Sequence, residues 1–510
     1  MNSFKIPYKT TNSFSKLIID YLNEDKKLQP FINHFPSLEN FEKQIVEKKK
    51  HIVNRSVLVE VLNDQNSSII LSNNSKENIR SLFNENTFTI TTGHQLCLFT
   101  GPLYFIYKVI STINLAEQLK EKYSDNNFVP VFWMASEDHD FEEVNHINLF
   151  GKKISWENRN NGAVGRMSLN GFQSVLCELK KVLGNSENTK DLLQLFEKTY
   201  LNHNTLSEAT RYLVNELFGK YGLVILDAND LRLKKQFIPI IRKDVLQKGF
   251  VTTIRDCSND LGENYKIQAF IRDINFFKLS DKKRELIKES MDVMEIEDNT
   301  EQFSPNVLMR PLYQEIILPN IAYIGGGAEV AYWMQLKTTF EKEDIPFPIM
   351  VLRNSAMILN SKQEQKINDL GFQKEDLFLP EDQLKKQYIL SKSQSDISLR
   401  NEKIKLENIF NNIIAKTSDI GFKNSISAQF KKQLNILNDL EQKLIRKEKK
   451  KHENALNQIE KIKSQLFPNN TLQERHDNFM PFYLINGRNF IERIKSNFNP
   501  LSPNFVVLTF

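Results

Sequence analysis

Carboxylates and histidines are concentrated in one short stretch, Glu137 to His146 (EDHDFEEVNH), which follows the apolar run Phe128 to Met134. A histidine with an ordinary pKa near ~6.5 can act as an acid or base, and a neighbouring aspartate can orient it. We therefore expect Asp138 and His139 to be catalytic. Other members of the stretch are expected to bind substrate or nucleotide: Glu137, Asp140 and His146.

Two other uses of this stretch stay open. Asp138, His139 and His146 could hold a divalent ion, although their spacing matches no closed zinc site. Carboxylates at the end of a strand also cap the helix that follows, which accounts for one or two of these residues but not for the whole cluster. We assign no metal ligands, and a metal requirement is left open.

A strand, a turn and a helix are predicted between Phe88 and Leu119. A β-branched and aromatic run is followed by a Gly-His-Gln turn, and Thr100 to Pro102 mark a helix start. Backbone N–H groups at that helix start would suit an anionic ligand. A plain strand-to-helix corner explains the stretch equally well. The residues expected to act here are Thr92, Gly93 and Gln95 in binding and His94 in catalysis; Cys97 lies near, where a small residue at a packing contact is the simpler explanation.

A second strand, glycine turn and helix are predicted from Ile321 to Lys337. Glycines between a strand and a helix let backbone amides approach a ligand. Arginines on either side of this stretch could each clamp a carboxylate or phosphate with two hydrogen bonds, and surface ion pairs are an equal alternative. The expected binding residues are Gly325, Gly326, Glu329, Tyr332, Gln335, Arg310, Arg353 and Asn354.

The elements that must position these residues indicate an α/β fold. Apolar runs without alternation, at Phe128 to Met134, Gly222 to Asp230 and Phe347 to Leu359, are typical of parallel strands covered on both faces. Helical spacing separates them, and the carboxyl ends of such strands are where ligands bind. The predicted organisation is a helical region over 1–85, a core over 86–380 with insertions at about 147–220 and 251–300, an antiparallel coiled coil over 385–466, and a segment over 467–510 that returns to the core.

The coiled coil is predicted from two helices joined near Gly421. The first helix has an apolar stripe from Leu406 to Ile413, and the second has one from Phe430 to Leu444, which Leu456 to Leu466 continue after the basic run. These stripes expose more apolar area than a projecting arm tolerates, so we expect a homodimer through the hairpin. The basic run Arg446 to His452 most often marks a solvated helix face.

Composition excludes several function classes. The 68 basic residues are offset by 63 acidic ones, for a net charge of +5, which does not indicate a nucleic-acid partner. Three scattered cysteines indicate neither a disulfide framework nor a zinc knuckle. No signal-peptide core and no run of about 18 apolar residues occurs, so we expect a cytoplasmic protein without a membrane partner.

Four stretches together resemble the bacillithiol-biosynthesis BshC family. They are TTGHQLCLFTGPLYFIYK, PVFWMASEDHDFEEVNH, SPNVLMRPLYQEIILPNIAYIGGGAEVAYWMQLK and LQERHDNFMPFY. This chain departs from the family pattern at two places. The family often has Gln where His94 stands, which counts against His94 as an indispensable acid or base. It also often has Gly-Gly-Pro-Gly-Glu where this chain has Gly-Gly-Gly-Ala-Glu, residues 325 to 329.

The resemblance implies a Rossmann-like core related to nucleotidyltransferases and class I aminoacyl-tRNA synthetases, with inserted connecting-peptide lobes and a dimerising coiled coil. The implied reaction joins cysteine to the amino group of glucosaminyl-malate, the last step of bacillithiol biosynthesis. Amide formation from a free carboxylate is uphill in water, so ATP or another adenine nucleotide is expected. In the related enzymes an adenylate would form over the Gly-His corner, where His94 would stabilise phosphate charge. Another adenylate-forming amino-acid ligase and a noncatalytic coiled-coil partner protein are the alternatives.

Overall fold

Five parallel strands form the centre of the molecule in the computed structural model, which describes residues 3–158, 162–280, 283–393 and 398–510. The strand order is β11-β10-β2-β3-β6, and each neighbouring pair is parallel. The bounds are β2 Thr87–His94, β3 Asn127–Met134, β6 Val224–Asp227, β10 Asn320–Gly325 and β11 Ile349–Leu352. Nearly every residue of these strands is buried, because helices cover both faces of the sheet.

The chain reverses its direction of winding between β2 and β10. From β2 the chain moves through β3 to β6 on one side, and then returns to β10 and β11 on the other. The crevice above such a reversal, at the carboxyl ends of the strands, is where open α/β sheets place ligands. The α/β fold expected from the apolar runs and the Rossmann-like core implied by the resemblance are both confirmed.

The helix after β2, α5 (Tyr104–Lys122), packs on β2 and β3. Strand β2 continues through Gly93 and His94, so the predicted turn at these two residues is wrong: both pair with β3 in register. The amide of Leu103 at the start of α5 donates to the carbonyl of Asp477 at 2.8 Å. That backbone amide is therefore taken by the returning tail of the chain and is not available to a ligand.

Two inserted lobes flank the carboxyl edge. The first lobe lies between β3 and β6. In chain order it consists of α6 (Phe141–Val144), the hairpin of β4 (His146–Leu149) and β5 (Lys152–Ser155), α7 (Gln173–Leu183), α8 (Glu187–Leu201) and α9 (Leu206–Phe218). Between β6 and β10 lie α10 (Leu231–Lys235), α11 (Ile238–Gln247), α12 (Val251–Gly262), β7 (Phe276–Leu279), β8 (Arg284–Leu286), α13 (Val293–Asp298), β9 (Phe303–Pro305) and α14 (Met309–Ile317). Strands β8, β7 and β9 form a small antiparallel sheet.

The first helices, α1 (Lys16–Leu22), α2 (Leu38–Lys49), α3 (Arg55–Gln65) and α4 (Asn73–Ser81), cover the core. Ahead of them, β1 (Ser3–Pro7) pairs with β13 (Asn504–Thr509), which also pairs with β12 (Ala356–Leu359). The run Phe347 to Leu359, expected to be one strand, is thus two strands in different sheets. Between the two strands, the guanidinium of Arg353 lies 2.7 Å from the buried carboxylate of Glu474. Helices α22 (Met480–Asn486) and α23 (Asn489–Asn497) lead to β13.

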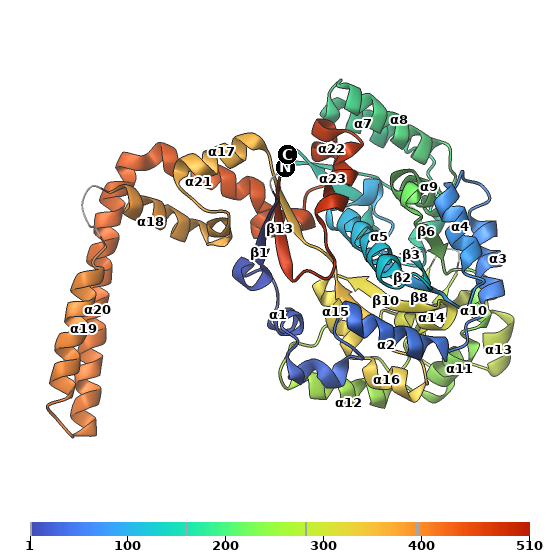
Figure 1. The fold of residues 1–510 in the computed structure, drawn as a ribbon, viewed down its shortest axis with the longest axis horizontal. Helices are drawn as coiled ribbons and strands as arrows, with labels where there is room; N and C mark the ends of the chain where they lie inside the picture. The colour runs from blue at the N-terminus through green and yellow to red at the C-terminus, as the bar shows by residue number, and fades with distance from the viewer. Residues whose placement is uncertain (1–2, 159–161, 281–282, 394–397) are drawn as a thin grey trace.

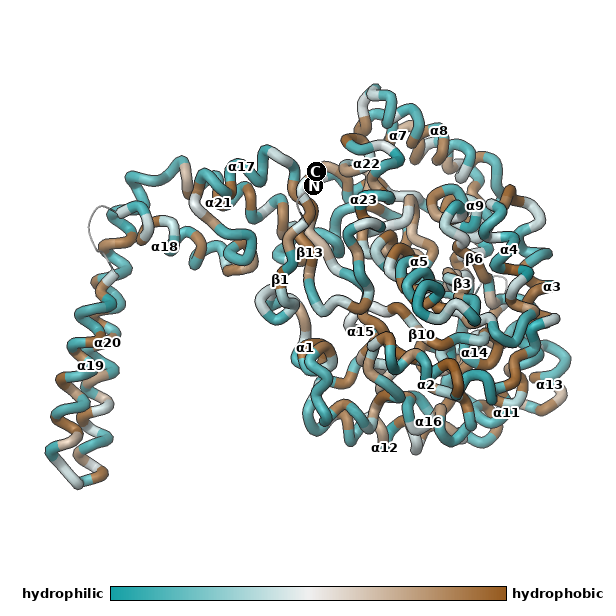
Figure 2. Tube along the Cα trace, in the orientation of Figure 1, coloured by the Kyte–Doolittle hydropathy of each residue, from teal (hydrophilic) through white to brown (hydrophobic). Residues whose placement is uncertain are grey.

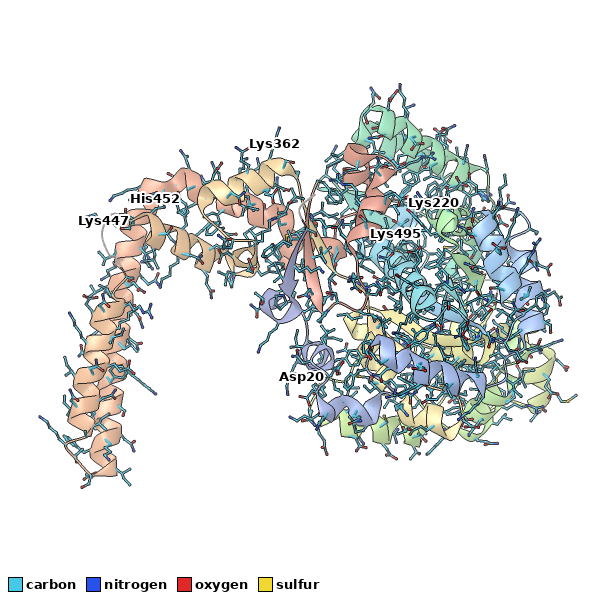
Figure 3. The ribbon with its side chains drawn as sticks, in the orientation of Figure 1. Asp20, Lys220, Lys362, Lys447, His452 and Lys495 are labelled. Atoms are coloured by element: carbon cyan, nitrogen blue, oxygen red, sulfur yellow. The ribbon has the colours of Figure 1, made fainter. Side chains whose placement is uncertain are left out.

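An arm projects from the core at the side where β1 and β13 lie (Figure 1). It begins with α17 (Ser361–Leu370) and α18 (Glu381–Lys392), and its far part is the antiparallel hairpin of α19 (Arg400–Ile414) and α20 (Ile420–Lys449). Hydrophobic and hydrophilic residues alternate along this hairpin (Figure 2). Lys447 and His452, in the basic run, lie at the bend where α20 gives way to α21 (Glu453–Leu466) (Figure 3).

The two leucine-rich stripes differ in their exposure to solvent. Leu456, Ile459, Ile462 and Leu466 on α21 are buried within the chain itself, where α21 packs on α18. The expectation that this stripe is exposed is therefore wrong, whereas Leu440 and Leu444 on α20 are 45% and 40% exposed. Among the described helices, none combines the length and the apolar character needed to cross a membrane.

Candidate active site

Two adjoining cavities open at the carboxyl edge of the parallel sheet. The smaller, of about 270 Å³, lies above the reversal between β2 and β10. The larger, of about 400 Å³, lies beside the ends of β3 and β6 and is also lined by residues of the β7–β9 lobe. Trp133, Ala135 and Arg310 line both cavities, so the two meet at these residues.

A buried ion pair forms one wall of the smaller cavity. The Nζ of Lys108, on α5, lies 2.6 Å from Oε2 of Glu329 and donates to the carbonyl of Gly93 at 2.7 Å. Tyr323 donates to Oε1 of Glu329 at 2.6 Å, and the amide of Gly326 donates to Oε2 at 2.8 Å. Burial alone would raise the pKa of Glu329, but the Lys108 ammonium and these hydrogen bonds lower it below its ordinary value. Glu329 is therefore a fixed carboxylate at the first turn of α15 (Gly327–Met334).

Arg310 lies where the two cavities meet. Its guanidinium lies 5.2 Å from the ring centre of Tyr323 and 5.8 Å from those of Trp133 and Trp333. It donates to Gln314 at 3.0 Å and to the hydroxyl of Tyr332 at 3.3 Å, both neutral groups. Among the described residues, no carboxylate lies within ion-pair distance of it, so this cation is available to an anionic ligand.

The larger cavity brings a second guanidinium close to a fixed carboxylate. Arg284 stacks on Phe277 at 4.0 Å and donates to Ser304 at 3.2 Å and to the carbonyl of Pro305 at 2.9 Å. Asp138 accepts from Nε2 of Gln95 at 2.9 Å. Burial alone would raise the pKa of Asp138, but the Gln95 hydrogen bond, the Arg284 guanidinium and two backbone amides lower it. Asp138 therefore stays ionised at neutral pH.

His94 lines the smaller cavity as a neutral imidazole. Burial, with the Lys108 ammonium in second place, lowers the pKa of His94 to about 4. Its Nδ1 lies 2.8 Å from the carbonyl of Gln95, so Nδ1 carries the proton and only Nε2 remains, as an acceptor. An unprotonated Nε2 offers a phosphate no hydrogen-bond donor, and the expected stabilisation of phosphate charge by His94 stays a prediction. Burial also raises the pKa of Cys97 to about 12, so its thiol is not ionised.

His139 lies beside both Asp138 and Arg284. Its Nδ1 is 3.6 Å from Oδ1 of Asp138 and 3.2 Å from NH1 of Arg284, so the orientation of His139 by Asp138 stays a prediction that depends on the tautomer of the imidazole. Asp138 uses Oδ1 to accept from the amides of His139 and Asp140, at 2.7 and 3.3 Å. His139 and Asp140 line a third cavity, of about 480 Å³, which shares Arg284 with the larger cavity.

The other expected site residues take mainly supporting positions. Gly93, Gln95 and Arg310 line the smaller cavity and Glu137 the larger, where Glu137 pairs with Lys234 at 2.5 Å. Gly325 ends β10, Gly326 is the N-cap of α15, and Tyr332 accepts from Arg310. These three lie outside both cavities, as do His139, Asp140 and His146. The remaining expected residues also lie outside and bond to the protein: Thr92 to Ile324, Gln335 to Ala269, Arg353 to Glu474 and Asn354 to Ser111.

The positions of the histidine and carboxylate side chains bear on whether the site could hold a metal ion. Across the described ranges of the chain, no group of three His, Cys, Asp or Glu side chains comes together in a way that could hold a metal ion. His146 lies on β4 with its Nδ1 against Oδ1 of Asn145 at 3.0 Å. The set Asp138, His139 and His146 is therefore not gathered into one site.

Sequence reasoning missed Lys108, Tyr323, Trp133 and Arg284. Lys108 had a usable signal, since it is the single charged residue between Tyr104 and Leu115 in an otherwise apolar helix. A lone lysine in such a helix must find an anionic partner when the helix is buried. Arg284 had no such sequence signal, because it lies on a three-residue strand in a charged segment.

Comparisons with known proteins agree with this architecture. Residues 1–354 match the family model described as the N-terminal Rossmann-like domain of bacillithiol biosynthesis BshC, and residues 356–510 match its C-terminal coiled-coil domain. A protein of Christiangramia forsetii is 45% identical over 99% of this chain and 98% of its own length, and one of Flavobacterium johnsoniae is 44% identical over 99% of both. One of Bacillus cereus is 28% identical over 94% of this chain and 95% of its own. All three bear the name "Putative cysteine ligase BshC".

Proposed function

We propose, from the fact that this chain belongs to the bacillithiol-biosynthesis BshC family, that it is a cysteine ligase. It joins the carboxyl group of L-cysteine to the amino group of glucosaminyl-malate, which completes bacillithiol. The new bond is an amide, and the activation of the carboxyl group uses ATP.

The observation that carries this proposal is the guanidinium of Arg310. A cation enclosed by three aromatic rings with only neutral hydrogen-bond partners is stabilised when an anion binds beside it. Both proposed substrates bear carboxylates. The position of Arg310 between the two cavities supports a role in holding one substrate against the other.

The larger cavity suits the carboxylate-bearing sugar. Arg284 and Arg310 both line it, and the described residues offer neither of them a carboxylate within ion-pair distance. The malate part of glucosaminyl-malate has two carboxylates, which match two guanidiniums. We assign the smaller cavity to cysteine, whose carboxyl group then meets the sugar amine beside Arg310.

The proton balance assigns roles to two acceptors. The amine attacks the activated carboxyl carbon, the C–N bond forms, the leaving group departs with the bonding pair, and one amine proton must be removed. Asp138 is an ionised carboxylate in the larger cavity, and Nε2 of His94 is an unprotonated acceptor in the smaller one. We assign the orientation of the amine to Asp138 and a hydrogen bond to the smaller substrate to His94.

ATP, when bound, would supply the leaving group that makes amide formation downhill. Because Arg284 and Arg310 are assigned to the carboxylates of the sugar substrate, Arg272 is the remaining cation in the lining of the larger cavity that would face a phosphate.

Omission of single components from a ligation assay tests the proposal. Purified full-length protein is incubated with cysteine, glucosaminyl-malate and ATP, and the thiol products are labelled and identified by mass spectrometry. Bacillithiol is expected only in the complete mixture. Product without ATP contradicts the proposed activation. Product with another amino acid and not with cysteine favours the alternative adenylate-forming ligase, and no product from any amino acid favours a noncatalytic partner protein.

We also propose that the chain forms a homodimer through the hairpin of α19 and α20. Ile436, Leu440 and Leu444 on α20 are 51%, 45% and 40% exposed, and Ile404 and Ile409 on α19 are 46% and 55% exposed. The hairpin projects away from its own core (Figure 1), so a second copy is the simplest cover for this apolar surface.

A further inference from the structure

A relay of three buried polar side chains runs from α11 to the first turn of α14. It begins at Asp244, which is fully buried on α11. The carboxylate of Asp244 accepts from the backbone amide of Asn275 at 2.5 Å and from its side-chain Nδ2 at 3.1 Å. Burial raises the pKa of Asp244 to about 6, although these two hydrogen bonds oppose the rise, so it is ionised at neutral pH.

The relay continues to the helix that bears Arg310. Nδ2 of Asn306 donates to Oδ1 of Asn275 at 2.9 Å, and the backbone amide of Asn306 donates to the carbonyl of Asn275 at 2.9 Å. Oδ1 of Asn306 accepts from the amides of Leu308 and Met309, at 2.9 and 3.0 Å. The carbonyl of Asn306 accepts from the amide of Arg310 itself at 3.0 Å.

The two ends of the relay, together with the carbonyl of Arg272, which accepts from Nδ2 of Asn275 at 3.2 Å, determine the orientation of both side-chain amides. An ionised carboxylate only accepts, so Asn275 must turn its NH₂ to Asp244 and its oxygen to Asn306. The backbone amides at the start of α14 only donate, so Asn306 must turn its oxygen to them and its NH₂ to Asn275. Reversal of any one side-chain amide would set donor against donor in a buried place, which costs the desolvation of both groups.

We infer that Asp244 is a positioning residue for Arg310, through Asn275 and Asn306. It acts on the backbone at the start of α14 and touches no substrate. The inference rests on the proposed function for the role of Arg310 in substrate binding. Asn306 and Arg310 line the same cavity, so a shift of the first turn of α14 moves the guanidinium relative to the larger cavity.

The test uses one variant that disrupts the hydrogen bond between residues 244 and 275 and a second variant that restores it. Asp244→Asn introduces a donor at the acceptor end, so one amide contact in the relay must fail. In the double variant Asp244→Asn with Asn275→Asp, the carboxylate lies at position 275, where it accepts from residue 244 on one side and from Asn306 on the other. The orientation of Asn306 is thereby restored. The hydrogen bond that Asn275 donates to the carbonyl of Arg272 is lost. Asp260→Asn, at an exposed position on the neighbouring α12, is the matched control.

In the ligation assay, Asp244→Asn is expected to raise KM for glucosaminyl-malate by about tenfold and to change kcat by less than about threefold. The double variant and Asp260→Asn are expected to keep the wild-type KM. In an Arg310→Met background, Asp244→Asn is expected to add less than about twofold to KM, because both changes remove the same interaction. An unchanged KM in Asp244→Asn, no repair in the double variant, or an undiminished effect in the Arg310→Met background overturns the inference.

A spectroscopic readout separates failure of this inference from failure of the proposed function. Two of the three tryptophans in the chain, Trp133 and Trp333, flank the Arg310 guanidinium. The near-ultraviolet circular dichroism of Asp244→Asn is expected to change and that of the double variant to match the wild type, whether or not the protein ligates cysteine. If Asp244→Asn does not fold, a folded double variant with wild-type KM supports the relay, and a double variant that also fails to fold overturns it.

Discussion

Burial of His94 decides which chemistry this side chain can perform. Its residue type and place after Gly93 predict an acid or a phosphate-binding cation, but the Lys108 ammonium and the surrounding protein keep the imidazole neutral. The same burial links His94 to stability. Its folded pKa, lowered to about 4, lies below the ordinary value of 6.5, so the unfolded chain takes up the proton first as the pH falls.

We predict that His94→Gln removes part of the acid sensitivity of folding. In the wild type, the contribution of His94 is fully present above pH ~6.5 and declines as the pH falls towards ~4, by about 3 kcal/mol in total. Denaturant unfolding at several pH values from 7 to 4 measures this difference between the two proteins. Parallel pH profiles would contradict the neutral, buried imidazole. Turnover at pH 7 is expected to persist in His94→Gln, since related proteins often have Gln at this position.

The Lys108–Glu329 pair leads to a second prediction. Lys108→Met leaves the Glu329 carboxylate without its counter-ion in a largely buried site, at a cost of about 3 kcal/mol of unfolding free energy. The double variant Lys108→Met with Glu329→Gln is expected to recover at least about 1 kcal/mol of that loss. Urea unfolding of the wild type, the two single variants and the double variant measures the four free energies of unfolding. If the losses of the two single variants simply add in the double variant, the pair is not coupled.

Part of the candidate site could be predicted from residue types alone. Asp138, Gln95, Glu329 and Arg310 were expected because strand-end carboxylates, glycine turns and lone arginines have recognised uses, and the structure brings these four to one edge of the sheet. Arg353 illustrates the limit. Its type predicts a ligand clamp, but its partner Glu474 lies 121 positions away, and only the fold reveals that the charge is already paired.

At the scale of elements, strands with long apolar runs were predictable and short strands with distant partners were not. β3 and β10 are recognisable because burial on both faces demands continuous apolar residues. β1, β12 and β13 come from the beginning, middle and end of the chain, and their pairing depends on contacts that no local pattern encodes. β11 and β12 are separated by three residues that include Arg353, which pairs with the distant Glu474.

The Arg353–Glu474 pair joins the end of β11 to the returning tail, and this gives a prediction for the element it holds. Glu474→Gln leaves the Arg353 charge uncompensated at 6% side-chain exposure and is expected to destabilise the fold by about 3 kcal/mol. Glu453→Gln, an exposed carboxylate on α21, is the control and is expected to change stability by less than about 0.5 kcal/mol. Equal unfolding midpoints in urea would mean that the pair does not hold the tail.

For the whole molecule, the arm predicts an oligomeric state. Leu440→Glu with Leu444→Glu places two charges on the exposed face of α20 and is expected to convert a dimer into a folded monomer, since charges are depleted from the cores of such interfaces. Ile52→Glu, at a position that is 93% exposed on the core, is the control and is expected to leave the dimer intact. Light scattering on the three full-length proteins measures the mass. A monomeric wild type, or a dimeric double variant, would remove this role from the hairpin.

The central claim is that the Arg310 guanidinium, which has no ion-pair partner among the described residues, holds the substrates for ligation where the two cavities meet. Formation of bacillithiol by Arg310 variants tests it most directly. With cysteine, glucosaminyl-malate and ATP, Arg310→Met is expected to lower kcat/KM by about a hundredfold or more, as befits the loss of about 3 kcal/mol of charge-assisted binding. Arg255→Met, an exposed arginine on α12, is expected to retain wild-type activity. An Arg310→Met protein that makes bacillithiol at the wild-type rate would contradict the account.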